Sequence, residues 1–406
     1  MMIGVRLFSF ARAVILAACL AAGCVFAAVE TRAAEPVKVG PKARVLSHAV
    51  AVKGVCAWPN LQKLADGSVV ATIFNQPCHG EWEGDVDCWA TTDGGASWHF
   101  RGRPAPHEPA TNRMNVATGT NAKGELIVLA SGWSHRNPPP PEGKPTPAPT
   151  HLPPLPIWVC RSADYGKTWT HAEGVELPST SRLATGHKLS DRLVPFGNII
   201  RIGDGKLGAC LYAFDQSEKD CASCFFTSAD DGVSWSIASV IGTGLNETTP
   251  LRLTNGDLLA CARTIWVKQP PHEMRLELFR SRDNGASWTS EQSVTGPMEH
   301  PAHLLELSDS RIVLTYGDRS SPSFWSTFPN GTPGKAEFDN GIEVRISADG
   351  GKSWSPPQRI AGFDGDGGYP ATVELADGRL LTAFYAKRTT DHADYQMATV
   401  TWQLPD

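Results

Sequence analysis

The segment Ser347–Trp354 reads SADGGKSW, and four other octapeptides share its pattern of Ser or Thr, Asp, Gly and Trp. They are Thr91–Trp98, Ser162–Trp169, Ser228–Trp235 and Ser281–Trp288, with their aspartates at positions 93, 164, 230 and 283. In such a turn the Asp accepts backbone hydrogen bonds, the Gly adopts a conformation that side chains disfavour, and the Trp packs onto the next layer. Because this local role explains every fixed position, we interpret the repeat as a structural turn and not as a catalytic or metal-binding motif.

A second repeat alternates with these turns. Six segments contain two apolar runs around a short polar turn such as Asp-Gly or Asn-Gly, which is a β-hairpin signal. They cover residues 61–74, 121–131, 199–214, 250–263, 303–319 and 372–385. One octapeptide follows each of the first five hairpins and joins two further strands, so a unit of four strands recurs. The pattern predicts an all-β chain, a six-bladed β-propeller of four-stranded antiparallel blades.

The ends of the repeat array indicate how the ring closes. The sixth unit has a hairpin without an octapeptide and ends in the strand-like run 395–404, while the strand-like run 43–50 stands alone near the N-terminus. We expect one terminal run to complete the blade of the other, because this hides two unpaired strand edges. The proline-rich segment 137–156 is expected to be an excursion between strands of the second blade, since proline cannot donate within a sheet.

The first 34 residues have the features of a secretory signal peptide. Arg6 and Arg12 precede an apolar run that ends near Ala28, and small residues suited to cleavage follow. Residues 35–406 would then form the propeller of a secreted or periplasmic protein. A lipoprotein anchor at Cys24 is the alternative. No later apolar run approaches the ~20 residues that a membrane span needs.

Charge and cysteine content limit the partners. The net charge of −5 and a pI near 6.2 provide no basic footprint, so we do not expect nucleic acid as a partner. The eight cysteines after the signal favour disulfides in an exported chain, with Cys78–Cys88 and Cys221–Cys224 as the nearest pairs. The pair Cys221 and Cys224 also permits a metal or redox role, but no second C-x-x-C completes a zinc site, so we predict no metal.

Five Asp-box turns on six four-stranded units resemble the sialidase (neuraminidase) superfamily over nearly the whole chain after the signal. The resemblance implies a Tyr nucleophile activated by a Glu, an Asp general acid/base and three Arg that bind the substrate carboxylate. The segment around Tyr369 is similar to the one that carries the nucleophile. Glu247 takes the place of the activating Glu, and Arg263 that of one Arg. The alternative is a core Tyr and a surface ion pair.

The chain departs from the family at the other two arginines. Ala57 stands where the first Arg is expected, and restoring Arg there should strengthen the binding of a carboxylated sugar. Ile342 stands at the third Arg position, with Arg345 three residues away. Arg319 and His300, at the ends of predicted inner strands, are candidates to bind the substrate instead. A structural histidine is the alternative for His300, and without a third ligand it forms no zinc site with His303.

The general acid should lie in the loop that follows the first hairpin. This loop contains several acidic residues, among which we favour Asp85 or Glu81 as the acid, with His79 as a further acid or substrate-binding candidate. A disulfide between Cys78 and Cys88 would hold the loop rigidly. The alternative is a solvated acidic loop without a catalytic role.

These features together predict an exported glycoside hydrolase that needs no cofactor and acts on the terminal sugar of an oligosaccharide or glycoconjugate. Acidic sugars are among the candidates, although the two unmatched arginines weigh against strict sialidase activity. A polysaccharide lyase or a non-sialic glycosidase on the same fold is the first alternative, and a carbohydrate-binding propeller without turnover is the second. The sequence fixes neither the sugar nor the oligomeric state.

Overall fold

The structure is a computed structural model that describes residues 42–134, 154–176, 189–215, 221–265, 273–321 and 339–405. The expected signal peptide and most of the proline-rich segment 137–156 lie outside these ranges. The described residues form β-strands and one 3-10 turn, Gly203–Gly205, which confirms the predicted all-β class. Within these ranges no helical segment has the length and apolar content needed to cross a bilayer.

The strands form four sheets of seven, nine, four and four strands, within which the antiparallel pairs fall into six successive groups of four along the chain. The first group is β2 (Asn60–Lys63), β3 (Val69–Phe74), β4 (Val86–Thr91) and β5 (His99–Ala105). The second is β6 (Asn115–Thr120), β7 (Leu126–Ser131), β8 (Trp158–Ser162) and β9 (Thr170–Glu173). The third is β11 (Leu189–Arg201), β12 (Leu207–Asp215), β13 (Cys221–Ser228) and β14 (Trp235–Thr243), with the short β10 (Val175–Glu176) parallel to β14.

The fourth group is β15 (Leu245–Arg252), β16 (Leu258–Thr264), β17 (Leu276–Ser281) and β18 (Thr289–Ser293). The fifth contains β19 (Glu299–Glu306), β20 (Ile312–Asp318), β21 (Asn340–Ser347) and the first part of β22 (Gln358–Glu374). The rest of β22 continues into the sixth group with β23 (Leu380–Arg388), β24 (Gln396–Gln403) and β1 (Arg44–Lys53). One long strand therefore serves two neighbouring groups.

The two chain ends meet in the sixth group. β1 pairs antiparallel with β24, from Arg44 opposite Gln403 to Lys53 opposite Gln396. The N-terminal strand thus covers the edge that the C-terminal strand would otherwise expose. The expectation that both terminal strands lie in the last group is confirmed.

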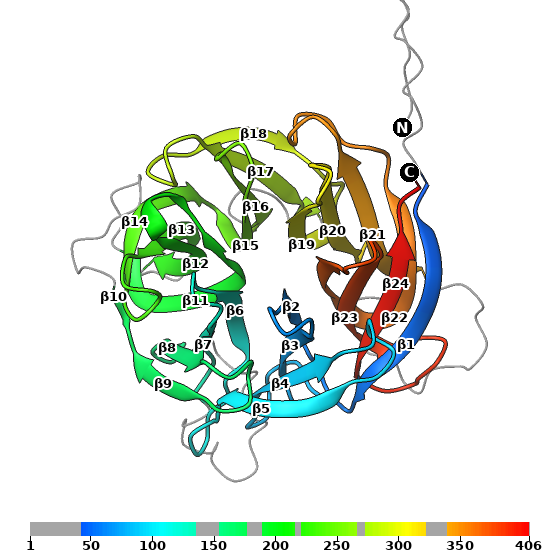
Figure 1. The fold of residues 1–406 in the computed structure, drawn as a ribbon, viewed down its shortest axis with the longest axis horizontal. Coiled ribbons are helices and arrows are strands. Elements are labelled where there is room, and N and C mark those ends of the chain that lie inside the picture. Colours follow the sequence, from blue (N-terminus) through cyan, green and yellow to red (C-terminus); the bar gives the residue numbers. More distant parts are fainter. Residues whose placement is uncertain are drawn as a thin grey trace, which may run out of the picture. The chain divides into compact units, whose positions relative to one another are not determined.

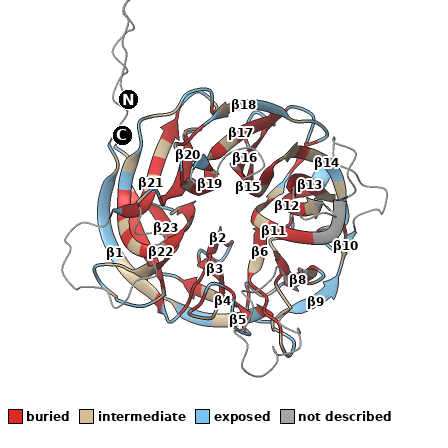
Figure 2. Cartoon of the chain, turned by 180° about the vertical axis from the view of Figure 1, so that it is seen from behind, coloured by how far each residue is buried: buried red, intermediate tan, exposed pale blue. Residues whose placement is uncertain are grey.

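The six groups follow one another around a common centre, with β2, β6, β11, β15, β19 and the second half of β22 nearest to it (Figure 1). β6 and β11 pair in parallel where two groups meet. Burial decreases outward: β3 is buried along its whole length, whereas β9 is exposed throughout (Figure 2). The apolar residues of each strand fill the layers between neighbouring groups, which leaves the inner strand ends to carry polar side chains toward the centre.

The five octapeptides form the expected turns. In the fifth, Asp349 accepts bonds from the Ser347 hydroxyl (2.8 Å) and from the amides of Lys352 (3.0 Å) and Ser353 (2.9 Å). In the first, the Ser97 hydroxyl is the largest of several donors that lower the pKa of Asp93 to about 2. Both oxygens of each of these carboxylates accept hydrogen bonds within their own turn, which fits a structural role.

The expected disulfide between Cys78 and Cys88 is wrong, because both are buried thiols that form no disulfide, as are the other six cysteines after residue 34. Cys88 lies in the middle of β4 and packs in a cluster with Val70 and Leu126. Cys78 packs in a different cluster, which contains Trp58 and Met114. The two side chains therefore enter separate layers, and they cannot close the loop between them.

Candidate functional site

The bend in β22 presents Tyr369 toward the inner ends of the strands. The pairing of β22 with β23 shifts register between Asp364 and Gly367 and again between Gly368 and Ala371. Tyr369 has a φ of 52° and Gly368 a φ of 117°, both in a region that side chains disfavour. A Cβ on Gly368 would lie 3.0 Å from Nε of Arg319, so glycine is required there. A bulky residue held in such a conformation is a feature of functional sites.

Tyr369 meets the two residues predicted to accompany it. Its hydroxyl donates to Oε1 of Glu247, from β15 of the fourth group, and Nη1 of Arg263, from β16, donates to Oε2 of the same carboxylate at 2.7 Å. The side chains of Glu247 and Arg263 are 11% and 16% exposed. The structure thus brings together three residues that are separated by up to 122 positions in the chain.

The electrostatics of this trio keep the phenol protonated. Burial is the largest cause that raises the pKa of Tyr369 above its usual value, and the negative charge of Glu247 adds to it. Burial opposes the charge on Arg263, but the Glu247 carboxylate raises the pKa of the guanidinium, which stays charged. The phenol can therefore become a nucleophile only if its proton moves as it attacks. Glu247 is placed to accept that proton.

Aromatic rings and Arg319 hold the Tyr369 ring in place. The Arg319 guanidinium lies over the ring, 4.8 Å from its centroid, and donates to the carbonyl of Gly367 at 2.8 Å. Rings of Trp58 and Phe196 contact Tyr369 edge-on, with centroids 6.1 and 5.9 Å away. Arg319 therefore lies beside Tyr369 and supports the phenol through these contacts, and its role in substrate binding stays a prediction.

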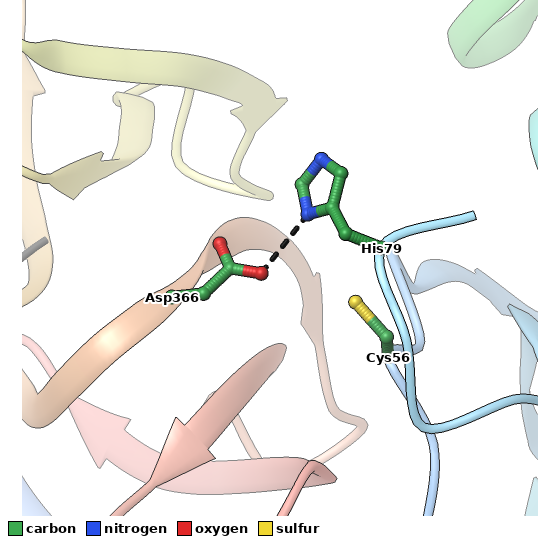
Figure 3. Close-up of side chains that lie close together, drawn as sticks. All are labelled: Cys56, His79 and Asp366. Atoms are coloured by element: carbon green, nitrogen blue, oxygen red, sulfur yellow. Dashed lines mark hydrogen bonds and ion pairs between the residues drawn. The ribbon is translucent and has the colours of Figure 1, made fainter. Parts of the chain in front are cut away.

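A second network lies beside the first and centres on Asp366, three residues before Tyr369. Oδ1 of Asp366 accepts from the Tyr385 hydroxyl at 2.7 Å, and Oδ2 accepts from the Tyr395 hydroxyl at 2.8 Å. Nδ1 of His79 lies 2.9 Å from Oδ2 (Figure 3). Burial opposes the charge of Asp366, but these donors and the charges of His79 and Arg319 hold its pKa well below the usual range. Asp366 is thus a carboxylate that orients His79.

Among the residues that the structure describes, one group could hold a metal ion. The ligand atoms of Cys56, His79 and Asp366 lie within 4.8 Å of one another, and sulfur, imidazole and carboxylate ligands together suit zinc. However, both oxygens of Asp366 already accept hydrogen bonds, and burial raises the pKa of the Cys56 thiol well above its usual value. Protein donors alone satisfy the carboxylate, so the geometry does not require a cation.

His300, a predicted substrate-binding residue, is buried, with 1% of its surface exposed. Its two ring nitrogens have no hydrogen-bond partner among the described residues. Burial, and then the charges of Arg263 and Arg319, lower its pKa well below the usual value, so the ring is neutral. By contrast, Nδ1 of His303 accepts the Thr372 amide at 3.3 Å, which is a structural contact.

The acidic candidates lie elsewhere in the same loop. Asp85 is 2.8 Å from Nη1 of Arg103 and 2.6 Å from Nδ1 of His107, and it has no described contact with Tyr369. Its oxygens hold the loop to β5 and the segment that follows, which does not favour an acid role. Glu81 is exposed, near enough to Cys56 and Tyr395 to raise the pKa of each. Within this loop, His79 is the residue that reaches the Asp366 network.

Buried apolar residues occupy the two positions at which the resemblance to sialidases implies an arginine. Ala57 and Ile342 are fully buried in hydrophobic clusters. Arg345 donates to the Tyr316 hydroxyl at 3.4 Å within the fifth group and so does not replace the missing cation. The burial of Ala57 does not favour the expectation that Arg at this position would bind a carboxylate, because a guanidinium there would displace packed side chains of the core.

Comparison with known proteins identifies the fold. A family model described as a BNR repeat-like domain matches residues 85–382. A protein of unknown function from Dyadobacter fermentans is 21% identical with a TM-score of 0.68, covering 90% of this chain and 100% of the other. The Hadza microbial sialidase Hz136 is 18% identical with a TM-score of 0.59, and the match covers 86% of this chain and 65% of the sialidase.

A Trypanosoma rangeli sialidase, in complex with 2,3-difluorosialic acid as a covalent intermediate, is 14% identical with a TM-score of 0.59. The match covers 86% of this chain and 54% of the sialidase, so the chain spans about half the length of that enzyme. None of the curated proteins matches the chain. At these identities the solved structures show a shared fold and do not transfer an activity.

Proposed function

Because this chain belongs to the BNR repeat-like domain family, as the sequence resemblance indicated, we propose that it is an exported glycoside hydrolase on a six-bladed propeller of the sialidase type. It removes a terminal sugar from an oligosaccharide or glycoconjugate and retains the configuration of the sugar. The observation that carries the proposal is the hydrogen bond from the Tyr369 hydroxyl to Glu247.

The chemistry follows from this contact. The Tyr369 oxygen attacks the anomeric carbon, its proton passes to Glu247, and the bond to the leaving oxygen breaks as that oxygen takes a proton from a general acid. A glycosyl–tyrosine results. Water then attacks the same carbon and gives a proton to the same group, now a base, while Glu247 returns its proton to the phenolate as the C–O bond to Tyr369 breaks. A neutral phenol suits this role because it does not repel an anionic sugar as a carboxylate would.

The test is to trap the intermediate. The purified chain would be incubated with a panel of fluorinated glycosyl fluorides that covers neutral hexoses, uronic acids and sialic acid, and then digested for peptide mass spectrometry. We expect one sugar of the panel to add its mass to the peptide that contains Tyr369. Tyr369→Phe should abolish both the adduct and turnover of the aryl glycoside of that sugar. Full turnover by Tyr369→Phe would overturn the proposal.

A lyase is the second candidate. It is favoured by His79, which lies near Tyr369 because the ring of Trp58 contacts both residues. A lyase would abstract a proton next to a uronate carboxylate and release an unsaturated sugar that absorbs in the ultraviolet. The same reaction mixtures, with uronate polysaccharides added, distinguish the two activities. An ultraviolet-absorbing product without a Tyr369 adduct would favour the lyase. If both signals are absent but the chain binds a sugar measurably, a carbohydrate-binding propeller is favoured.

A further inference from the structure

His79 is one of the acid candidates that the loop sequence offers, and the structure adds Asp366, which no motif indicates, as its partner beside the proposed nucleophile. We propose that His79 is the general acid/base of this site and that Asp366 is the residue that positions it. This inference rests on the proposed hydrolase function, in which a group must give a proton to the leaving oxygen and later take one from water. A histidine held by a carboxylate can do both.

The hydrogen bonds fix which nitrogen of His79 is free. Asp366 accepts from two phenols and is an anion, so Nδ1 of His79 carries the hydrogen that it shares with Oδ2. Nε2 has no partner among the described residues and points away from Asp366 (Figure 3). The His79 side chain is 50% exposed, so a bound sugar can reach Nε2. The carboxylate thereby sets both the tautomer and the direction of the ring.

Three contacts tie His79 to the nucleophile. Asp366 and Tyr369 stand on the same strand, β22, three residues apart. The ring of Trp58 contacts His79 edge-on, with centroids 4.8 Å apart, and also contacts Tyr369. Tyr385, which donates to Asp366, packs against Tyr369 with centroids 5.7 Å apart. His79 and Tyr369 are therefore linked directly through Trp58, and indirectly through Asp366 and Tyr385.

Protons are conserved over the two steps of the reaction. In the first, protonated His79 gives the Nε2 proton to the glycosidic oxygen as that bond breaks and the bond to Tyr369 forms. In the second, neutral His79 takes a proton from the attacking water as the bond to Tyr369 breaks. Glu247 holds the phenol proton in between. At the end of the cycle both side chains have regained their starting protonation states.

The acid/base function can be separated from nucleophilic attack by varying the leaving group. For the sugar that labels Tyr369, phenyl and dinitrophenyl glycosides would be compared in wild type and His79→Ala. We expect His79→Ala to lose about 10²–10⁴-fold in kcat/KM on the phenyl glycoside and less than about tenfold on the dinitrophenyl glycoside, which needs no proton. Added azide should yield a glycosyl azide in His79→Ala alone. Equal losses on both glycosides, without azide product, would overturn the inference while leaving the Tyr369 adduct intact.

The positioning role of Asp366 is tested with a matched variant on the same strand. Asp366→Asn should lower kcat/KM more on the phenyl glycoside than on the dinitrophenyl glycoside, because the imidazole that gives a proton to the leaving oxygen loses the carboxylate that orients it. Asp364→Asn, which removes a partner of Arg388 two residues earlier, should leave both values unchanged. Equal losses on the two glycosides in Asp366→Asn would contradict the role.

A metal-dependent site is the competing interpretation, and it makes the opposite prediction for Cys56. If His79 and Asp366 act without a metal, Cys56→Ser and treatment with EDTA should both leave kcat/KM within about twofold. If EDTA abolishes activity, and zinc restores it in wild type but not in Cys56→Ser, the acid/base assignment is wrong.

Discussion

The ion pair between Glu247 and Arg263 provides a quantitative test of the site. Glu247→Gln keeps the size of the side chain and an oxygen that can accept from Arg263, but it removes the negative charge. Arg263 is then left as a largely buried cation whose Nε already has no partner among the described residues. The substitution therefore isolates the energy of that charge in a site with little solvent.

The expected cost follows from the burial of the pair. Removing one partner of a buried ion pair costs about 3–5 kcal/mol, because the other charge stays without compensation. Since the amide oxygen of Gln keeps one bond to Arg263, we expect the lower end, about 3 kcal/mol of unfolding free energy. Tyr369→Phe removes one hydrogen bond and leaves the ion pair, so about 1–2 kcal/mol is expected.

A matched control exists in the fifth group. There Glu343 accepts from the Tyr316 hydroxyl at 3.0 Å and from Arg359 at 3.2 Å, the same trio of residue types. Arg359 also pairs with Asp318, so Glu343→Gln does not leave the arginine without an anion. We expect Glu343→Gln to cost about 1 kcal/mol and to leave turnover unchanged.

The assay is urea unfolding followed by tryptophan fluorescence, with Glu247→Gln, Tyr369→Phe, Glu343→Gln and wild type measured together. A double variant, Glu247→Gln with Arg263→Met, should recover part of the loss because it removes the isolated cation. A loss below about 1 kcal/mol in Glu247→Gln, or no recovery in the double variant, would refute the reasoning that the charge is paired in a poorly solvated site.

Three further outcomes test the fold and its core. Burial lowers the pKa of His303 to about 4 from a usual 6.5, so below pH 6.5 the unfolded chain binds a proton that the folded chain does not. His303 should therefore lower the free energy of unfolding by about 2 kcal/mol from pH 7 to pH 5. Urea unfolding of His303→Gln should lack this part of the pH dependence. Asp230→Ala removes the acceptor of the Ser234 amide in the third Asp-box turn and should lower unfolding free energy by about 1–2 kcal/mol with turnover intact. Ala57→Arg, which places a charge in a closed core, should lower the melting temperature markedly and give no gain in uronate or sialoside binding by calorimetry.

The fold could be predicted because its signals are local. Each Asp-box turn is stabilised by its own residues, as Asp349 shows, and each hairpin carries its turn type in two or three positions. Tyr369, Glu247 and Arg263 could be located because they adjoin the hairpins, and strand order then brings them together. The repeated turns and hairpins predict the order of the strands along the chain, which no single segment does.

The Asp366 network could not be predicted in the same way. The run around Asp366 is Asp-Gly-Asp-Gly-Gly, which has no periodicity that distinguishes one aspartate from the other. Its partners, Tyr395 and His79, lie 29 and 287 positions away, and only the tertiary structure joins them. The loop sequence favours Asp85 as the acid for the converse reason, since it does not reveal that Arg103 and His107 contact this carboxylate. The role of a polar residue depends on the residues that it contacts, and the sequence alone does not show these contacts.

Comparison of the two Tyr–Glu–Arg trios explains why one is a site and the other a structural contact. Tyr316, Glu343 and Arg359 stand opposite one another on adjacent strands of a single sheet, so ordinary strand pairing suffices to bring them together. Tyr369 reaches Glu247 from another group of strands, by way of a disfavoured backbone conformation that local pairing would not select. Strain of this kind costs about 1–3 kcal/mol and persists only where the surrounding structure imposes it. Gly368 permits this conformation and the packing of Arg319 over the ring favours it, which agrees with the proposed role of Tyr369 as a nucleophile.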